Sequence, residues 1–204
     1  MSRITTVRTY DFRFPTSQTL SGSDAMNKDP DYSTAYAEIS TDADDGIRGA
    51  GFVFTIGRGN DVVCKAIESM SHVLIGRNVE ELLDNMKIAW YLLVHDSQLR
   101  WLGPEKGVEH MAIGAVLSAL WDIKAKRAGK PLWRLLSDME PEELVGTLDF
   151  RYMPEHPDAT DVFGTHLDAA YPRTTYPLVC LGVRSCSGHG RTPGARRLDR
   201  GPIT

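Results

Sequence analysis

Two lysines one residue apart, Lys124 and Lys126, come closest to a catalytic base pair in this 204-residue sequence. On a strand, residues i and i+2 point to the same face, so two lysines could converge on one substrate. On a helix, the same two positions diverge by about 200°. These lysines end the longest helical pattern of the chain, so we interpret them as solvated helix residues. We predict no catalytic residue in this sequence.

A glycine-rich stretch, residues 57–60 (GRGN), precedes a helical pattern. Backbone amides at such a position could bind a phosphate. The stretch lacks the lysine of a P-loop and the third glycine of a dinucleotide fingerprint. We therefore interpret it as a simple helix cap.

Candidate metal ligands do not form a convincing set. His95 and His110 have no acidic or histidine partner at ligand spacing. Cys180, Cys186 and His189 lie in a segment without apolar periodicity and are weak evidence for zinc. We predict no metal ligand in this chain.

The composition is that of a globular protein, with 42% hydrophobic and 25% charged residues. There is no run of 18 or more apolar residues, and the first residues lack the features of a signal peptide. Three cysteines form neither a disulfide framework nor a zinc-finger spacing. We expect no membrane contact, a cytoplasmic location and reduced cysteines.

Charge is distributed unevenly along the chain. The net charge is −4, yet residues 173–204 contain six arginines and one acid, which leaves the preceding residues strongly acidic. An acidic body argues against nucleic acid as a partner. The basic tail alone could bind RNA or an anionic surface weakly. We predict no nucleic-acid partner.

The amino-terminal third is typical of strands. Residues 3–14, 34–40 and 50–56 are rich in β-branched, aromatic or alternating apolar residues and are separated by turn signals. They predict an antiparallel meander. The polar loop between the first two strands, about residues 16–33, is too long for a tight turn, and loops of this length are often functional.

Helical periodicity then takes over. An apolar stripe from Val63 to Leu74 ends at Gly76, and a second helix is predicted over residues 79–93 after the capping pair Asn78 and Glu81. The stripe of residues 107–127 predicts the central helix of the core. Its least accessible side chains should include Met111, Ala115 and Leu120. A short helix (LWRLL) should follow, and residues 145–153 (VGTLDFRYM) read as a strand.

Residues 112–136, AIGAVLSALWDIKAKRAGKPLWRLL, carry a recognisable spacing of Trp121, Asp122, Lys126 and Pro131. This spacing resembles the mandelate racemase branch of the enolase superfamily. Three further stretches, residues 13–33, 54–63 and 95–116, followed by LDFRY at 148–152, resemble fuconate and related aldonate dehydratases. The resemblance covers residues 1 to about 153.

The resemblance implies an α+β fold. Residues 1–145 would form the enolase-superfamily amino-terminal capping domain, a three-stranded antiparallel meander with a helical bundle. Residues 146–172 would begin a truncated (β/α)8 TIM barrel with its first strand. Residues 173–204, rich in arginine and without apolar period, would be a disordered tail or a change of reading frame.

The resemblance also implies an activity, the Mg²⁺-dependent dehydration of a sugar acid such as L-fuconate. The base and the Mg²⁺ ligands of the family lie in the barrel, so this chain alone should be inactive. The capping loop would contact the sugar acid through Gly22, Ser23, Asp24 and Tyr32. The alternative is that Asp24 merely begins a turn and Tyr32 merely anchors the strand.

The identity of the substrate and the assembly stay open at this point. L-galactonate or another aldonate would serve equally well as the sugar acid. The product could also be a non-catalytic capping fragment that binds full-length partners. A full-length family member could form a homo-oligomer.

Overall fold

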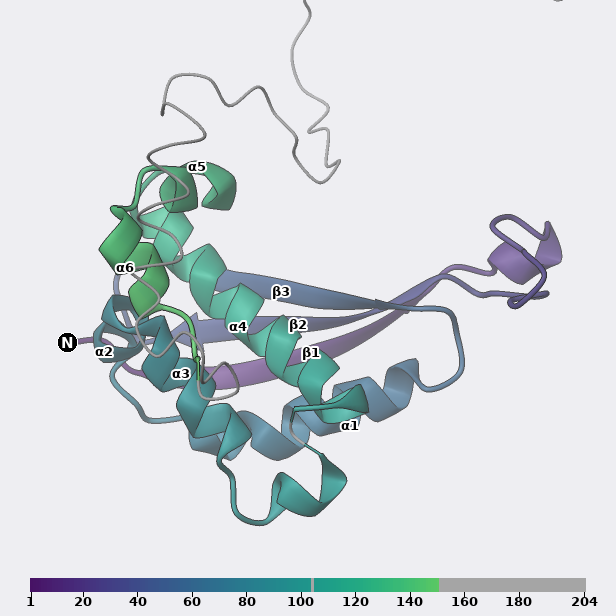
Figure 1. Ribbon diagram of the computed structural model, residues 1–204, viewed down its shortest axis with the longest axis horizontal. Helices are drawn as coiled ribbons and strands as arrows, with labels where there is room; N and C mark the ends of the chain where they lie inside the picture. Colours follow the sequence, from purple (N-terminus) through teal and green to yellow (C-terminus); the bar gives the residue numbers. More distant parts are fainter. Residues whose placement is uncertain (104, 151–204) are drawn as a thin grey trace, which may run out of the picture. The chain divides into compact units, whose positions relative to one another are not determined.

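The computed structural model describes residues 1–103 and 105–150, and its first elements form an antiparallel sheet (Figure 1). The strands are β1 (Ile4–Arg13), β2 (Ser33–Thr41) and β3 (Arg48–Thr55), in the order β1-β2-β3. Residue pairs such as Tyr10 with Tyr36 and Tyr36 with Phe52 set the register. The predicted meander is confirmed.

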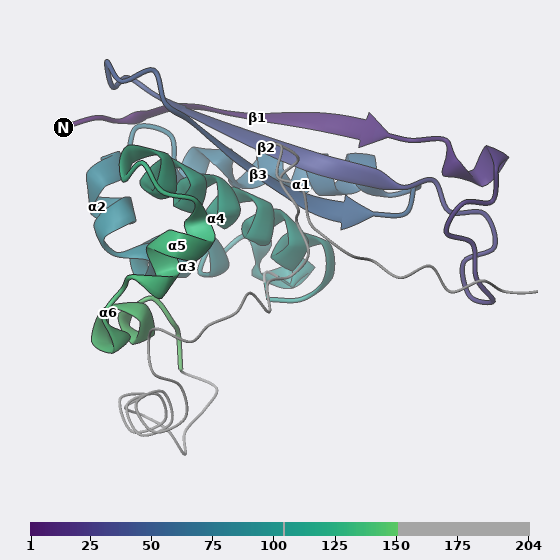
Figure 2. The ribbon, with the colours of Figure 1, turned by 90° about the horizontal axis from the view of Figure 1, so that it is seen from above.

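Six α-helices occur in the described residues: α1 (Asn60–Met70), α2 (Val79–Asp84), α3 (Met86–Val94), α4 (Gly107–Arg127), α5 (Leu132–Ser137) and α6 (Pro141–Gly146). All of them lie on one side of the sheet (Figure 2). The residues of β2 that face the helices are small or aliphatic. Ala35, Ala37 and Ile39 are fully buried and alternate with partly exposed neighbours, as expected for a strand with one buried face. None of the described helices is long and apolar enough to cross a membrane.

Helix α4 is the centre of the core, as its periodicity predicts. Seven of its side chains are fully buried, namely Ala112, Ile113, Ala115, Val116, Ala119, Leu120 and Ile123. The expectation for Met111 is wrong, because Met111 is only partly buried and packs at the margin of the core. Alanines occupy much of the α4 face that contacts the sheet, and their small side chains let the helix lie close to it.

The close approach of α4 to the sheet depends on glycine in β3. A Cβ atom on Gly51 would lie 2.0 Å from the Ala115 carbonyl oxygen, and one on Gly49 would lie 2.2 Å from the Ala119 carbonyl oxygen. Only glycine leaves room for the helix backbone at these positions.

The Trp-Asp and Lys spacing of α4 protects the sheet edge. Asp122 accepts a hydrogen bond from the Ala50 amide at 2.8 Å, and Lys126 donates one to the Arg48 carbonyl at 2.7 Å. These two backbone groups of the edge strand β3 are thereby occupied. Lys124 instead lies over the Trp121 ring, so the two lysines diverge and the helical interpretation is confirmed.

The second predicted helix is interrupted. Asn85 has φ −136° and ψ 84°, which ends α2 and starts α3. Its side-chain oxygen accepts a hydrogen bond from the Ile88 amide at 3.3 Å, so the asparagine caps a new helix rather than continuing the old one. The prediction of one helix over residues 79–93 is therefore wrong, although Asn78 caps α2 as expected.

The predicted strand over residues 145–153 is not seen where the structure describes the chain. Residues 145 and 146 belong to α6, which starts with Pro141 followed by Glu142 and Glu143, a composition that favours a helix start. Residues 147–150 contain no strand. The rest of this segment, and the predictions for residues 151–172 and 173–204, lie outside the described residues.

Glu109 is a buried acid at the start of α4. Glu109 is only 5% exposed, and its Oε2 atom has no hydrogen-bond partner among the described residues. Burial, and secondarily the charge of Asp96, raises the pKa of this carboxyl group. The pKa of Glu109 is therefore higher in the folded state than in the unfolded state. As the pH rises above the unfolded pKa, ionisation of Glu109 favours the unfolded state and lowers the free energy of unfolding.

We predict that Glu109→Gln stabilises the fold at pH 7 by about 1 kcal/mol, since it removes an ionised group from a poorly hydrated site. The gain should shrink as the pH falls through the acid range, where Glu109 itself is protonated. Urea denaturation at several pH values measures it. The exposed Glu142→Gln serves as control. An equal gain at acid and neutral pH would argue against this account.

Candidate functional site

The loop between β1 and β2 extends beyond the end of the sheet (Figure 1). Hydrogen bonds close its base. The Thr16 hydroxyl donates to the Pro30 carbonyl at 2.7 Å and accepts from the Tyr32 amide at 3.0 Å. The Ser17 amide donates to the Asp31 carboxylate at 3.0 Å. This closed base fixes the direction in which the loop leaves the sheet.

Gly22 and Tyr32, two of the predicted contact residues, touch each other. The Tyr32 hydroxyl lies 3.4 Å from the Gly22 carbonyl oxygen. Gly22 has φ +76°, and a Cβ atom there would lie 1.8 Å from the Tyr32 hydroxyl oxygen. The Tyr32 ring also meets the Phe54 ring edge-on, with centroids 5.2 Å apart. Tyr32 therefore joins the loop to the sheet.

Asp24 begins a turn inside the loop. Its Oδ1 atom accepts hydrogen bonds from the amides of Asn27 at 2.6 Å and Met26 at 2.8 Å. These bonds, that of Asn27 first, lower the pKa of the Asp24 carboxyl, so it is ionised at neutral pH. Asp24 and its neighbour Ser23 are exposed. The other oxygen, Oδ2, lies 3.4 Å from the Asn27 side-chain nitrogen, so the carboxylate builds the turn while it stays on the surface of the loop.

A second loop, residues 56–59, lies against the base of the first. The Asp31 amide donates to the Ile56 carbonyl at 3.2 Å. Hydrogen bonds from Ser17, and to a smaller extent the charges of Arg13 and Arg58, lower the pKa of Asp31. The sequence analysis does not single out Asp31, and its only signal in the sequence is an acid two residues before the start of β2. The contact brings the exposed Arg58 to the same end of the sheet.

The glycine-rich stretch starts α1, and Gly59 at the helix cap has a left-handed backbone. The cap interpretation is thus correct for Gly59, which makes no side-chain cap bond. Asn60 serves a different purpose, because it is fully buried. It accepts a hydrogen bond from the Thr55 hydroxyl at 2.7 Å and donates one to the Asp11 carboxylate at 2.6 Å. This network joins β1, β3 and α1 beneath both loops.

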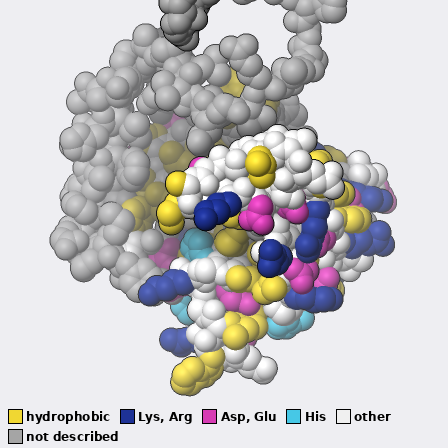
Figure 3. Space-filling model, turned by 90° about the vertical axis from the view of Figure 1, so that its right-hand side faces the viewer, with side chains coloured by type: hydrophobic (Ala, Val, Ile, Leu, Met, Phe, Trp, Pro, Cys, Tyr) yellow, Lys and Arg dark blue, Asp and Glu magenta, His cyan; other side chains and the backbone are white. Residues whose placement is uncertain are grey.

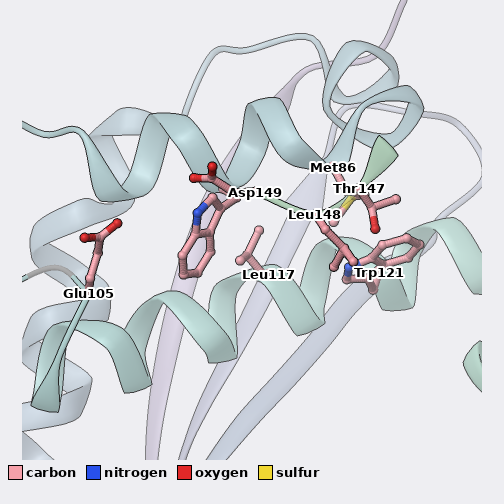
Figure 4. Close-up of a pocket in the computed structure, with 8 residues that line it drawn as sticks. Met86, Glu105, Leu117, Trp121, Thr147, Leu148 and Asp149 are labelled. Carbon is pink, nitrogen blue, oxygen red and sulfur yellow. The ribbon is translucent and has the colours of Figure 1, made fainter. Parts of the chain in front are cut away.

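A cavity of about 330 Å³ lies elsewhere, between α3, α4 and the segment after α6 (Figure 4). Apolar and aromatic side chains form much of its wall, including Leu117, Trp121 and Leu148, and Glu105 and Asp149 add two carboxylates. Asp149, the last of the lining residues, is next to residue 150, where the described part of the chain ends. The described wall of the cavity comes from α3, α4, Glu105 before α4 and residues 147–149.

The described residues offer no metal centre. No group of three or more histidine, cysteine or acidic side chains among residues 1–103 and 105–150 could hold a metal ion. His95 contacts the Tyr91 carbonyl and ring, and His110 contacts the Trp90 ring. Acidic and basic side chains are interspersed on the face seen in Figure 3, without a broad area of one charge.

Comparison with known proteins places this fold. Residues 28–137, just over half of the chain, match the family described as mandelate racemase / muconate lactonizing enzyme, N-terminal domain. The chain belongs to that family. Its described part has the fold of the amino-terminal capping domain of the enolase superfamily, as the sequence predicts.

Individual members of the mandelate racemase / muconate lactonizing enzyme family are similar to most of this chain. Human mitochondrial enolase superfamily member 1 is 48% identical over 153 residues, which are 75% of this chain and 34% of that protein. L-galactonate dehydratase of Hypocrea jecorina is 51% identical over 152 residues, 74% of this chain and 33% of the relative. The chain thus spans about a third of the length of the curated relatives it matches.

Solved structures of the family agree. The crystal structure of human mitochondrial enolase superfamily member 1 superposes with a TM-score of 0.76 at 45% identity and covers 80% of this chain and 38% of that one. A racemase from Streptomyces coelicolor with bound magnesium superposes with a TM-score of 0.56 at 30% identity, over 68% of this chain and 36% of that one.

Proposed function

We propose that this chain is the substrate-capping part of an acid-sugar dehydratase. The observation that carries the proposal is the loop of residues 16–33, whose closed base and ordered turn hold exposed polar groups beyond the end of the sheet. The 51% identity to an L-galactonate dehydratase supports the same reaction class. L-fuconate and L-galactonate are the favoured substrates.

The reaction would remove the proton next to the carboxylate and expel the 3-hydroxyl group as water. With L-fuconate the product would be 2-dehydro-3-deoxy-L-fuconate. Such chemistry needs a base, an acid for the leaving group and stabilisation of the enolate charge. The described residues do not fit Mg²⁺, because they bring no set of ligands together. We therefore assign the base and any Mg²⁺ site to sequence beyond residues 1–150.

Residues of the loop would bind the sugar acid. The ionised Asp24 can accept hydrogen bonds from vicinal hydroxyl groups, and the Tyr32 phenol can donate or accept one. Gly22 and Ser23 would offer backbone groups and a hydroxyl beside them. We also propose a cytoplasmic protein without nucleic-acid partners, because the acidic body of the chain disfavours binding to the nucleic-acid backbone.

A chimera tests this function. Residues 1–150 of this chain would replace the matching segment of the L-galactonate dehydratase from Hypocrea jecorina. We expect the folded chimera to dehydrate L-galactonate or L-fuconate, measured as 2-keto acid formed. We expect the 204-residue chain alone to show no turnover above a control without protein. A folded chimera inactive on all aldonates would favour a non-catalytic capping fragment.

We predict that Asp24→Ala and Tyr32→Phe each lower kcat/KM of the chimera. A lost hydrogen bond to the bound sugar acid should cost roughly 1 to 3 kcal/mol of transition-state stabilisation. This corresponds to about a five- to 150-fold decrease. The melting temperature should hardly change, since the loop contributes little to the core.

The variant Asp24→Asn separates the two interpretations of Asp24. Its side-chain oxygen can still accept the amides of Met26 and Asn27, so the turn should persist while the charge is lost. A loss of kcat/KM with Asp24→Asn assigns a binding role to the carboxylate. Parental kinetics for Asp24→Asn, Asp24→Ala and Tyr32→Phe would mean that these residues only build the turn and anchor the strand.

A further inference from the structure

A second cavity lies where α1 packs against the start of α4, beside the short 3-10 helix Leu99–Leu102 (Figure 1). We call it the α1–α4 cavity, and its volume is about 350 Å³. Val62, Ala66, Leu102 and Val108 form its apolar wall. Three of these side chains, Val62, Leu102 and Val108, are exposed. An apolar hollow at the surface suits a ligand with an apolar part.

Glu109 is a buried acid in the wall of the α1–α4 cavity. It is only 5% exposed, whereas its neighbours Val108 and His110 are exposed. An acid at the third position of a helix often folds back and accepts a hydrogen bond from an amide at the helix start. No such bond of Glu109 is found among the described residues, and its Oε2 atom has no partner there. Capping therefore does not explain this acid.

The other polar groups of the α1–α4 cavity leave Glu109 uncompensated. The Ser69 hydroxyl donates its proton to the Ala66 carbonyl at 2.7 Å, so towards a ligand it can only accept a hydrogen bond. Lys65 also lines the cavity, but its ammonium group lies 2.7 Å from the Glu68 carboxylate and forms an ion pair with it. The cavity thus offers an acid and a hydrogen-bond acceptor.

Stability does not account for Glu109 either. Its replacement by glutamine is expected to stabilise the fold, because the buried carboxyl lacks a compensating partner. Buried polar groups without partners are rare in native structures, and an acid of this kind beside a cavity often belongs to a binding site. The missing partner would be a group that carries positive charge and donates hydrogen bonds.

The surroundings of Glu109 restrict the class of ligand. Burial, and then the charge of Asp96, raises the pKa of Glu109, so an anion would meet two acids at this end of the cavity. No group of three or more histidine, cysteine or acidic side chains within residues 1–103 and 105–150 could hold a metal ion, which disfavours a bare metal cation. At about 30 Å³ per water-sized group, the cavity holds on the order of ten non-hydrogen atoms.

We propose that the α1–α4 cavity binds a small organic cation, an ammonium or guanidinium group on a short apolar chain. The cationic group would donate hydrogen bonds to Glu109 and Ser69, and the chain would pack against Leu102 and Val108. The loop of residues 16–33 contributes none of the described lining residues. The site is therefore separate from that loop, and the proposal does not depend on the dehydratase function.

Titration of the 204-residue chain with n-hexylammonium chloride, followed by NMR of the backbone amides, tests the site. We expect a Kd of about 1 mM or lower, as for a well-packed ligand of this size. The shifted amides should be those of residues 62–69 and 107–109. Hexan-1-ol has the same chain without the charge and should bind at least about tenfold more weakly. Hexanoate should not shift these amides.

Glu109→Gln keeps the size of the side chain and removes its charge. It should raise the Kd for hexylammonium at least about tenfold and leave the Kd for hexan-1-ol nearly unchanged. Ser69→Ala should raise the Kd for hexylammonium about two- to tenfold, since it removes only the neutral acceptor. Glu142→Gln is the matched control, because Glu142 is exposed in α6 and does not line the cavity. Circular dichroism of each variant checks its fold.

Three results would overturn the proposal. One is the absence of amide shifts around the cavity up to about 20 mM hexylammonium, well above the expected Kd. Another is an equal Kd for hexylammonium and hexan-1-ol, which would make the cavity a merely apolar hollow. The third is an unchanged Kd for hexylammonium in folded Glu109→Gln, which would show that the buried acid does not bind the cation.

Discussion

Replacement of Gly51 by alanine should lower the free energy of unfolding by about 3 kcal/mol or more. The new Cβ atom would lie 2.0 Å from the Ala115 carbonyl oxygen and 2.6 Å from the Ala119 amide nitrogen. Both are backbone atoms of α4, so no rotation of a side chain can relieve the clash. The helix would have to move away from the sheet, and overpacking of this kind is strongly destabilising.

Gly114→Ala provides a control within the same helix. Gly114 lies inside α4, and no atom is found within 4 Å of the place its Cβ would take. Alanine there should stabilise the fold by about 0.5 to 1 kcal/mol, because glycine is a poor helix former. Urea denaturation of both variants measures the two opposite shifts. A loss below about 1 kcal/mol for Gly51→Ala would show that α4 adapts more easily than its packing indicates.

Substitution of Asn60 by leucine should cost about 2 to 4 kcal/mol of stability, because Asn60 is a fully buried polar side chain with two partners. Leucine would leave the Asp11 carboxylate and the Thr55 hydroxyl without the hydrogen bonds that Asn60 provides. These partners come from different strands, so the junction of β1, β3 and α1 beneath the loops would loosen.

The cost of Asn60→Leu should depend on pH. Hydrogen bonds from Arg13, and then from Asn60, lower the pKa of Asp11 in the folded state. A lowered folded pKa stabilises the fold above the carboxyl's unfolded pKa, and this stabilisation is lost as the pH falls through the folded value. The difference between parent and variant should therefore decrease in acid. Asp61→Asn is the control, since Asp61 is exposed and contacts Arg13 only at 3.4 Å. If the difference in free energy of unfolding between the parent and Asn60→Leu does not change with pH, the hydrogen bond from Asn60 does not stabilise the ionised form of Asp11.

The elements of this fold follow from local patterns wherever one face of an element is continuously apolar. The stripe of residues 107–127 predicts α4 with the observed bounds. The pattern fails at Asn85, because the apolar period continues through α2 and α3 while the Asn85 side chain caps a new helix. It also fails at Met111, since periodicity marks a face and not the depth to which each residue on that face is buried.

The candidate site was less accessible to sequence reasoning than the fold. Resemblance to known dehydratases pointed to Gly22, Ser23, Asp24 and Tyr32, whereas spacing alone did not. Their role in substrate binding stays a prediction. The structure adds that Gly22 contacts Tyr32 and that Asp31 joins the two loops, and both contacts depend on how the chain returns to the sheet.

The family, the meander and the central helix could be predicted from the sequence, because they depend on residue type and on the local period of apolar residues. The folded structure was needed to see why β3 requires Gly49 and Gly51 and which sheet edge Asp122 and Lys126 protect. It was also needed to see that five aromatic rings share the outer face of the sheet, those of Tyr10, Phe12, Tyr36, Phe52 and Phe54. The physical reason is that these features arise between residues far apart in the chain. Their contacts depend on strand register and on the distance between helix and sheet, which no local pattern records.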